Sequence, residues 1–166
     1  MSYSALSVAN RFLELAKRDG QRLTNMQLQK LVYIAHGWNL CITGKPLFYH
    51  DVQAWQWGPV IPKLYRSLSK YGAGVVSELI PTNDPPIDPN TQENGVIESV
   101  WKSYGRMSAR QLSAITHGAD TPWRRIPQET GGSPYADIPD SLIAEHYRQL
   151  YNERTQRKQT PTTQPA

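Results

Sequence analysis

The 166-residue chain contains a single cysteine, Cys41, so it cannot form an internal disulfide bond. One free thiol is typical of a reducing compartment, and we expect a cytoplasmic protein. No stretch approaches the roughly 18 consecutive apolar residues that a membrane-spanning helix needs. The first few residues also lack the basic and apolar regions of a signal peptide. The sequence therefore predicts no membrane association and no secretion.

Motifs for phosphate and metal chemistry are missing as well. The glycine-rich pieces at 72–74 and 131–132 match neither the nucleotide-binding P-loop nor the dinucleotide fingerprint, and we interpret both as turns. The possible zinc ligands are His36, Cys41, His50 and Asp51, and they do not have the spacing of known zinc motifs. We expect His36 to face solvent. We therefore expect no metal site and no cofactor.

A histidine and an aspartate close together, His117 and Asp120, are the best candidates for catalysis. They could act as a base and its orienting group. No serine or cysteine, however, lies in a motif that would make it the nucleophile. A histidine at the end of a helix more often interacts with the last carbonyl groups and the helix dipole. We therefore predict that the protein is not an enzyme and has no catalytic residues.

The charge of the chain gives little support to nucleic-acid binding. Eighteen basic and fourteen acidic residues leave a formal net charge of +4. The basic residues are spread along the chain and interrupted by acidic ones, except for a short group near the end, which comprises Arg154, Arg157 and Lys158. Net charge alone is weak evidence for a nucleic-acid partner. A DNA-binding regulator is therefore kept only as an alternative.

Helical periodicity dominates the rest of the sequence. It predicts a helix over 4–19 and a second that opens at Thr24, where Gln27 completes a capping box. Gly37 inside this second helix would allow a close helix crossing. We expect a mainly α, compact single-domain bundle of about five to six helices, with a short extended segment near 47–57. Residues 1–154 form the domain in this prediction, and the polar stretch 155–166 is a disordered tail.

The most informative segment is Gln-Ala-Trp-Gln-Trp-Gly-Pro-Val at 53–60. Trp55 and Trp57 would share one side of an extended chain, and Pro59 could begin the helix that follows. Tryptophan and tyrosine dominate the energetics of protein interfaces. We therefore predict a partner-binding surface with the candidate residues Trp55, Trp57, Tyr65 and Trp123. Trp123 is expected in a proline-flanked irregular segment.

Several of these pieces, in this order, resemble the SocA-like, or Panacea-domain, antitoxin family. The resemblance rests on Lys-Leu-Val-Tyr-Ile-Ala at 30–35 with Gly-Lys-Pro-Leu at 44–47, and then on Ala54-Trp55, Gly58-Pro59-Val60 and Leu64-Tyr65. Leu112-Ser113, Thr116-His117 and Trp123 continue the pattern later in the chain. It covers roughly residues 5–150. The loop at 81–95 and the end at 155–166 have no counterpart, and partner specificity is expected in such segments.

The resemblance implies a mostly helical domain found in bacteria and their phages. It also implies an antitoxin that neutralises a cognate protein toxin by direct contact. One branch of the family resembles a protease adaptor that delivers its toxin for degradation, so a protease is the alternative partner. The sequence leaves open the identity of the toxin, the oligomeric state and the choice between these two mechanisms.

Overall fold

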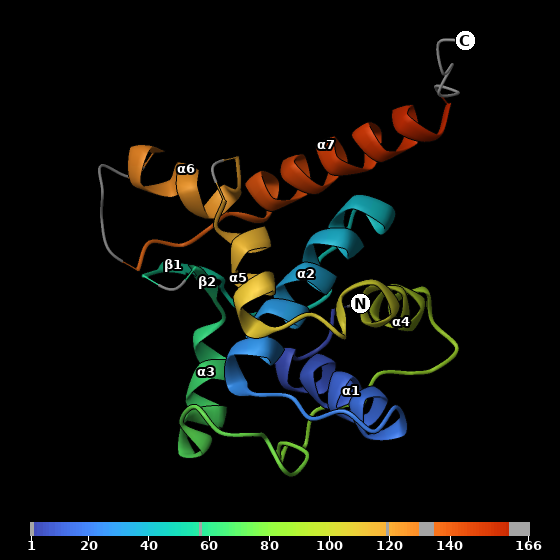
Figure 1. The fold of residues 1–166 in the computed structure, drawn as a ribbon, viewed down its shortest axis with the longest axis vertical. Coiled ribbons are helices and arrows are strands. Elements are labelled where there is room, and N and C mark those ends of the chain that lie inside the picture. The colour runs from blue at the N-terminus through green and yellow to red at the C-terminus, as the bar shows by residue number, and fades with distance from the viewer. Residues whose placement is uncertain (1, 57, 119, 130–134, 160–166) are drawn as a thin grey trace, which may run out of the picture.

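Helix α2 lies at the centre of the fold, with the other helices arranged around it (Figure 1). The computed structural model describes residues 2–56, 58–118, 120–129 and 135–159. Its elements in chain order are α1 (Ala5–Arg18), α2 (Asn25–Thr43), β1 (Gln53–Trp55), β2 (Gly58–Val60), α3 (Pro62–Leu68), the 3-10 helix η1 (Ser69–Tyr71), α4 (Gln92–Tyr104), α5 (Ala109–Thr116), α6 (Pro122–Glu129) and α7 (Asp140–Gln159). The prediction of a mainly helical, compact single domain is confirmed. The described residues form seven α-helices rather than the expected five to six, and the extended segment is a two-stranded antiparallel sheet that reaches Val60.

Helix α2 begins and ends where the local sequence predicts. The Thr24 hydroxyl accepts the Gln27 N–H at 3.3 Å, and the Gln27 side-chain oxygen accepts the Thr24 N–H at 2.9 Å, which confirms the capping box. Gly44 ends the helix in the left-handed conformation that glycine adopts most readily. Most of the residues between these ends are buried on every side of the helix. Such all-round burial is typical of a helix at the centre of a core.

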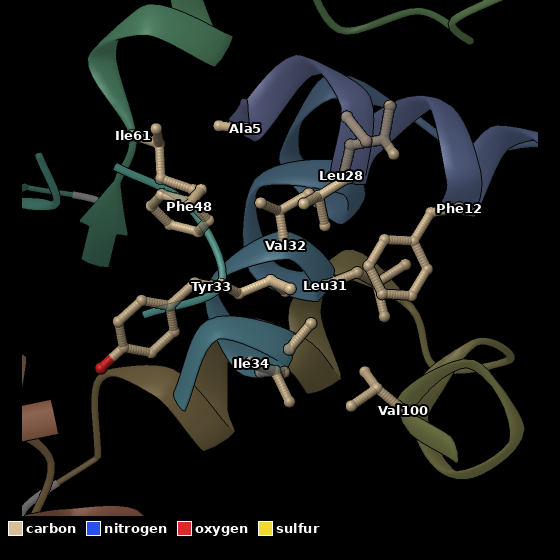
Figure 2. Close-up of a cluster of buried hydrophobic side chains, with 14 of the residues drawn as sticks. Ala5, Phe12, Leu28, Leu31, Val32, Tyr33, Ile34, Phe48, Ile61 and Val100 are labelled. Atoms are coloured by element: carbon tan, nitrogen blue, oxygen red, sulfur yellow. The ribbon is translucent and has the colours of Figure 1, made fainter. Parts of the chain in front are cut away.

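The core forms where α1, α4 and the chain around residue 48 close on α2 (Figure 2). Phe12 of α1, Leu31 of α2 and Phe48 are all at most 1% exposed. Burial of a large apolar side chain stabilises the fold by about 1.5–3 kcal/mol relative to leaving it exposed. The buried apolar residues of α2 therefore supply the surface on which the other elements pack.

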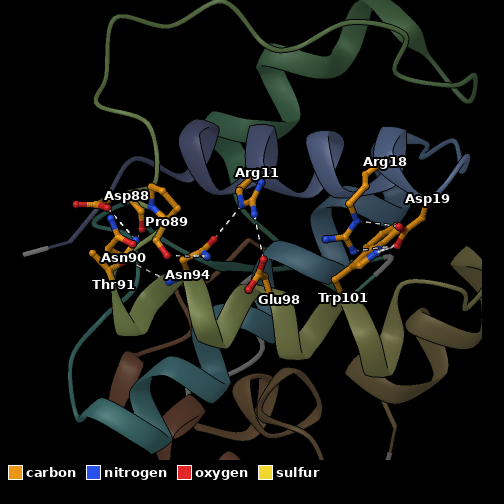
Figure 3. Close-up of polar contacts among 10 residues, drawn as sticks. All are labelled: Arg11, Arg18, Asp19, Asp88, Pro89, Asn90, Thr91, Asn94, Glu98 and Trp101. Carbon is orange, nitrogen blue, oxygen red and sulfur yellow. Dashed lines mark hydrogen bonds and ion pairs between the residues drawn. The ribbon is translucent and has the colours of Figure 1, made fainter.

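Polar contacts join α1 to α4, although α2, the two strands, α3 and η1 lie between them in sequence (Figure 3). Arg11 donates to the Asn94 side chain at 2.9 Å and to Glu98 at 3.1 Å. At the other end of α1, the Trp101 indole N–H donates to the Asp19 carboxylate at 2.7 Å. Hydrogen bonds from Arg18 and Trp101 lower the pKa of this carboxyl to about 2. These contacts set the register of α4 on α1.

Three sequence-based boundaries differ in the structure. The helix predicted from Pro59 begins at Pro62, because Pro59 belongs to β2, where it lies opposite Ala54. Trp123, predicted in an irregular segment, lies on α6. Helix α7 continues to Gln159, beyond the predicted domain end at 154, and residues 160–166 of the predicted tail lie outside the described residues.

His36 is buried, so the prediction that it faces solvent is wrong. Its Nδ1 accepts the Leu47 N–H at 3.3 Å, and its ring stacks on Phe48 with centroids 4.0 Å apart. The ring proton therefore resides on Nε2, which lies 2.8 Å from the Asp140 carboxylate and donates to it. This one side chain connects α2 to the chain at 47–48 and to the first residue of α7.

The predicted close crossing at Gly37 is present between α2 and α7. A Cβ atom at Gly37 would overlap the ring of Tyr147, which lies directly against the glycine. The same ring makes an edge contact with Trp38 at a centroid distance of 5.1 Å. The absence of a side chain at this position therefore sets the distance between the two helices.

We expect Gly37→Ala to lower the free energy of unfolding by about 1–3 kcal/mol, because the added methyl group must displace the Tyr147 ring. Gly95→Ala in α4 is a matched control, since a methyl group added there would meet no other atom within 4 Å. The control is expected to gain up to about 1 kcal/mol from helix propensity. Urea unfolding followed by circular dichroism measures the free energy of unfolding of both variants. Equal stabilisation of the two variants would contradict the close crossing.

Candidate functional site

The β1–β2 hairpin is held on α2 by two buried polar side chains. Gln29 accepts the Ile61 N–H at 3.0 Å, and Lys30 donates to the Pro59 carbonyl oxygen at 3.4 Å. Gln29 and Lys30 are 1% and 0% exposed. Buried backbone groups need hydrogen-bond partners, and α2 supplies them here through side chains. The hairpin therefore has a defined position on the helix.

The other edge of the hairpin pairs with the chain that leads into α7. The Ala54 N–H donates to the Ala136 carbonyl at 2.8 Å, and the Ile138 N–H donates to the Val52 carbonyl at 2.7 Å. Gln53 and Asp137 form the bridge between these bonds. Strand β1 thus lies between β2 and 136–138, and the start of α7 is tied to the hairpin.

Gly58 is the position where the hairpin comes closest to the interior. Its φ of +106° lies in the region that favours glycine. A Cβ atom here would lie 2.5 Å from the Lys30 Nζ and 3.3 Å from the His117 Nδ1. The glycine is thus needed twice, for its backbone conformation and for the room it leaves to these two side chains.

Burial controls the ionisation of both groups beneath Gly58. It lowers the pKa of Lys30 to about 7. It also lowers the pKa of His117, and the positive charge of Lys30 lowers this pKa further. The His117 Nδ1 is buried, and among the described residues it has no hydrogen-bond partner. A low pKa for both groups reduces the positive charge buried under the hairpin near neutral pH.

The pairing of His117 with Asp120 that catalysis would require is not the arrangement in the structure. Asp120 instead interacts with His146. Burial lowers the pKa of His146, and the backbone and the carboxylate of Asp120 both act to raise it. The His117 ring packs edge-on against Trp123, with centroids 5.0 Å apart. His117 therefore supports the hairpin and the α6 tryptophan.

Aromatic side chains gather on the outer side of the hairpin. The Trp123 indole N–H donates to the Trp55 carbonyl oxygen at 2.6 Å, which joins α6 to β1. The Trp55 ring lies 5.0 Å from the ring of Tyr65 and 5.4 Å from that of Tyr135. We call Trp55, Tyr65, Trp123 and Tyr135 the aromatic face. It brings together three of the four predicted contact residues, whereas Trp57 lies outside the described residues.

The aromatic face is accessible from outside the protein. Tyr135 is 60% exposed, and the other three members are partly exposed. The Arg124 guanidinium lies 5.6 Å from the Trp123 ring centroid and adds a positive charge beside the rings. Within the described ranges, no cluster of three potential metal ligands is present. The surface is suited to contact with another macromolecule through rings and one cation.

Sequence reasoning missed Lys30 and Tyr135 as parts of this site. A lysine inside a helix that is apolar on nearly every side was the available signal for Lys30, because such a cation needs a buried partner. No comparable signal marks Tyr135. It reaches the site only because 136–138 pairs with β1, and it adopts a positive φ of 61° there.

The chain is similar to a known protein family. Residues 28–124 match the family model described as "Antitoxin SocA-like, Panacea domain". A curated relative, "Antitoxin SocA" of Caulobacter vibrioides (strain NA1000 / CB15N), is 37% identical over 140 residues, which cover 78% of this chain and 73% of the relative. No solved structure matches the chain. No helix in the described part of the chain is long and apolar enough to span a membrane.

We expect Lys30→Met to remove part of the pH dependence of stability. The folded-state pKa of Lys30 is about 7, below the usual 10.5. Between these two pH values the amine keeps its proton in the unfolded chain but has released it in the folded chain. The stability of the wild type should therefore rise with pH in this window. The wild type should gain about 2 kcal/mol relative to the variant between pH 7.5 and 9.5.

Urea unfolding at these two pH values measures the difference. Lys63→Met is the matched control, because Lys63 is exposed on α3. It should leave the pH dependence of the wild type unchanged. Parallel pH profiles for Lys30→Met and the wild type would contradict the burial of a neutral amine beneath Gly58.

Proposed function

Because the chain belongs to the SocA-like antitoxin family with a Panacea domain, we propose that it neutralises a cognate protein toxin by direct contact. Family membership supports an antitoxin role in a toxin–antitoxin system and suggests a protein without enzymatic activity. The proposal adds the mechanism, which is occlusion of the toxin by binding. It also places the protein in the cytoplasm, where a single free thiol such as Cys41 persists.

The aromatic face is the observation that carries this proposal. Large aromatic side chains bury much area at a small cost in conformational entropy, and they dominate the binding energy of many interfaces. Here Trp55 stands on a hairpin whose backbone is bonded to α2 on one side and to 136–138 on the other, and the other members contact Trp55 from α3, α6 and the chain before α7. A surface fixed before binding loses little further freedom in the complex.

The four members of the aromatic face have different parts in this proposal. Trp123 is a positioning residue, because its indole N–H already donates to Trp55 and its ring already packs on His117. Trp55 and Tyr65 face each other at the edge of the hairpin and are the proposed contact residues. Tyr135 extends the same surface, since its ring packs edge-on against Trp55.

The first test is growth of cells that express each immediate genomic neighbour of this gene, alone and together with this protein. One neighbour should stop growth, and this protein should restore it. The amount of the toxin, followed by immunoblotting, should stay constant during rescue. A falling amount would indicate delivery to a protease instead. The absence of any toxic neighbour would contradict the proposal.

Substitution of the contact residues then tests the surface itself. We expect Tyr65→Ala and Trp55→Ala to weaken toxin binding by about 30-fold each, as at interface hot spots. Tyr49→Ala is the matched control, because Tyr49 is 59% exposed and lies outside the aromatic face. Calorimetric titration measures affinity, and circular dichroism verifies folding. Unchanged affinity in both folded variants would contradict a toxin contact at the aromatic face.

A further inference from the structure

A second surface of a different kind lies at the other end of α2. Its C-terminal residues Trp38 and Ile42, together with α4 and the second half of α7, enclose a groove of about 250 Å³. Ile42 and Tyr151 at its mouth are 51% and 53% exposed. The volume lies below the roughly 300–1,000 Å³ of small-molecule pockets, so side chains of another protein are better suited to it than a metabolite.

The α4 wall of the groove has the form of a helix-binding surface. Val96, Ser99, Val100 and Ser103 line it at intervals of three and four residues, which places them along one face of α4. They extend over about 10 Å along the helix axis, or two turns. Alternation of valine with the smaller serine leaves room for the side chains of a second helix. Amphipathic helices commonly bind in apolar grooves of this kind.

Arg154 supplies the charge of the groove. Its guanidinium donates to the Tyr104 hydroxyl at 3.0 Å and lies 4.9 Å from the Trp38 ring centroid. The Trp38 indole N–H also donates to this hydroxyl at 3.4 Å. Both partners of the guanidinium are uncharged, and in the described part of the chain it forms no ion pair with a carboxylate. The position of the cation is therefore set by contacts that leave its charge uncompensated.

A guanidinium has five N–H donors arranged to bind a carboxylate through two parallel hydrogen bonds. The tyrosine hydroxyl uses one of them. Arg154 is the single charged residue among those that line the groove in the described structure. Arg154 is itself exposed, so a partner that covers the guanidinium excludes water and strengthens its attraction to a negative group. The groove is thus complementary to an apolar segment that carries one carboxylate.

We infer that this groove binds an amphipathic helix of the toxin, with aliphatic side chains against Trp38 and Val100 and a glutamate or aspartate on Arg154. The inference rests on the proposed function and adds a second contact beyond the aromatic face. A second copy of this chain is a poorer occupant. In a two-fold contact the same patch meets itself, and this patch has no carboxylate to offer Arg154.

Charge reversal on α7 tests the inference. The probe is the neighbour-encoded toxin, synthesised in a cell-free system, and the full-length chain is titrated against it. Arg154→Glu should weaken binding by about 30-fold or more, because it places like charges together in the proposed complex. Arg157→Glu is the matched control, since it makes the same charge change at an exposed site on the same helix, outside the groove lining. The control should change affinity by less than about threefold.

A photo-crosslinking phenylalanine analogue in place of Tyr151 then identifies the toxin segment in the groove. Replacement of the carboxylate in that segment by lysine should restore the binding of Arg154→Glu. Equal losses in Arg154→Glu and Arg157→Glu would indicate general electrostatic attraction and overturn the inference. So would crosslinks that form only between copies of this chain.

The result also separates the two proposals. Wild-type binding and growth rescue, with no change in affinity for a folded Arg154→Glu variant, would overturn the groove and leave the proposed function in place. A wild-type chain that neither binds nor rescues would remove the proposed function, and with it a groove for the toxin.

Discussion

Burial of α2 on nearly every side is the constraint on which the rest of the structure depends. A helix in this position cannot send its polar side chains to water, so each of them must find a partner inside the protein. Gln29 and Lys30 bond to the backbone around β2, and His36 bonds to the Leu47 N–H and to Asp140. The buried polar groups therefore determine where the irregular segments and α7 attach.

The positions of the two proposed contact surfaces follow from this arrangement. Lys30 supports the hairpin near one end of α2, and Ile42 lines the groove near the other, about 18 Å further along the helix axis. One rigid helix thus separates two surfaces of different chemistry. The aromatic face presents rings on and around a hairpin that is bonded on both sides, whereas the groove presents apolar walls and one cation without an ion-pair partner in the described residues. In the proposed function these surfaces would hold one toxin at two points, which would lower its rate of dissociation.

Much of the fold could be predicted because its signals are local. The capping box at Thr24 predicted the start of α2, and it is present. The close crossing at Gly37 was also predicted correctly. The start of α3 was not, because the Gly58-Pro59 pair suits a helix start locally. The distant Gln29 side chain binds the Ile61 N–H and keeps the chain extended until Pro62.

The sequence by itself determined most of the helices and the family, because periodicity, caps and motifs depend on residues that are close together in the chain. Only the tertiary structure decided which aromatic residues meet. Tyr135 joins Trp55 through pairing of 136–138 with β1, a strand far earlier in the sequence. The groove likewise exists only because α2, α4 and α7 converge. Contacts between distant segments depend on how the core packs, and no local pattern records that packing.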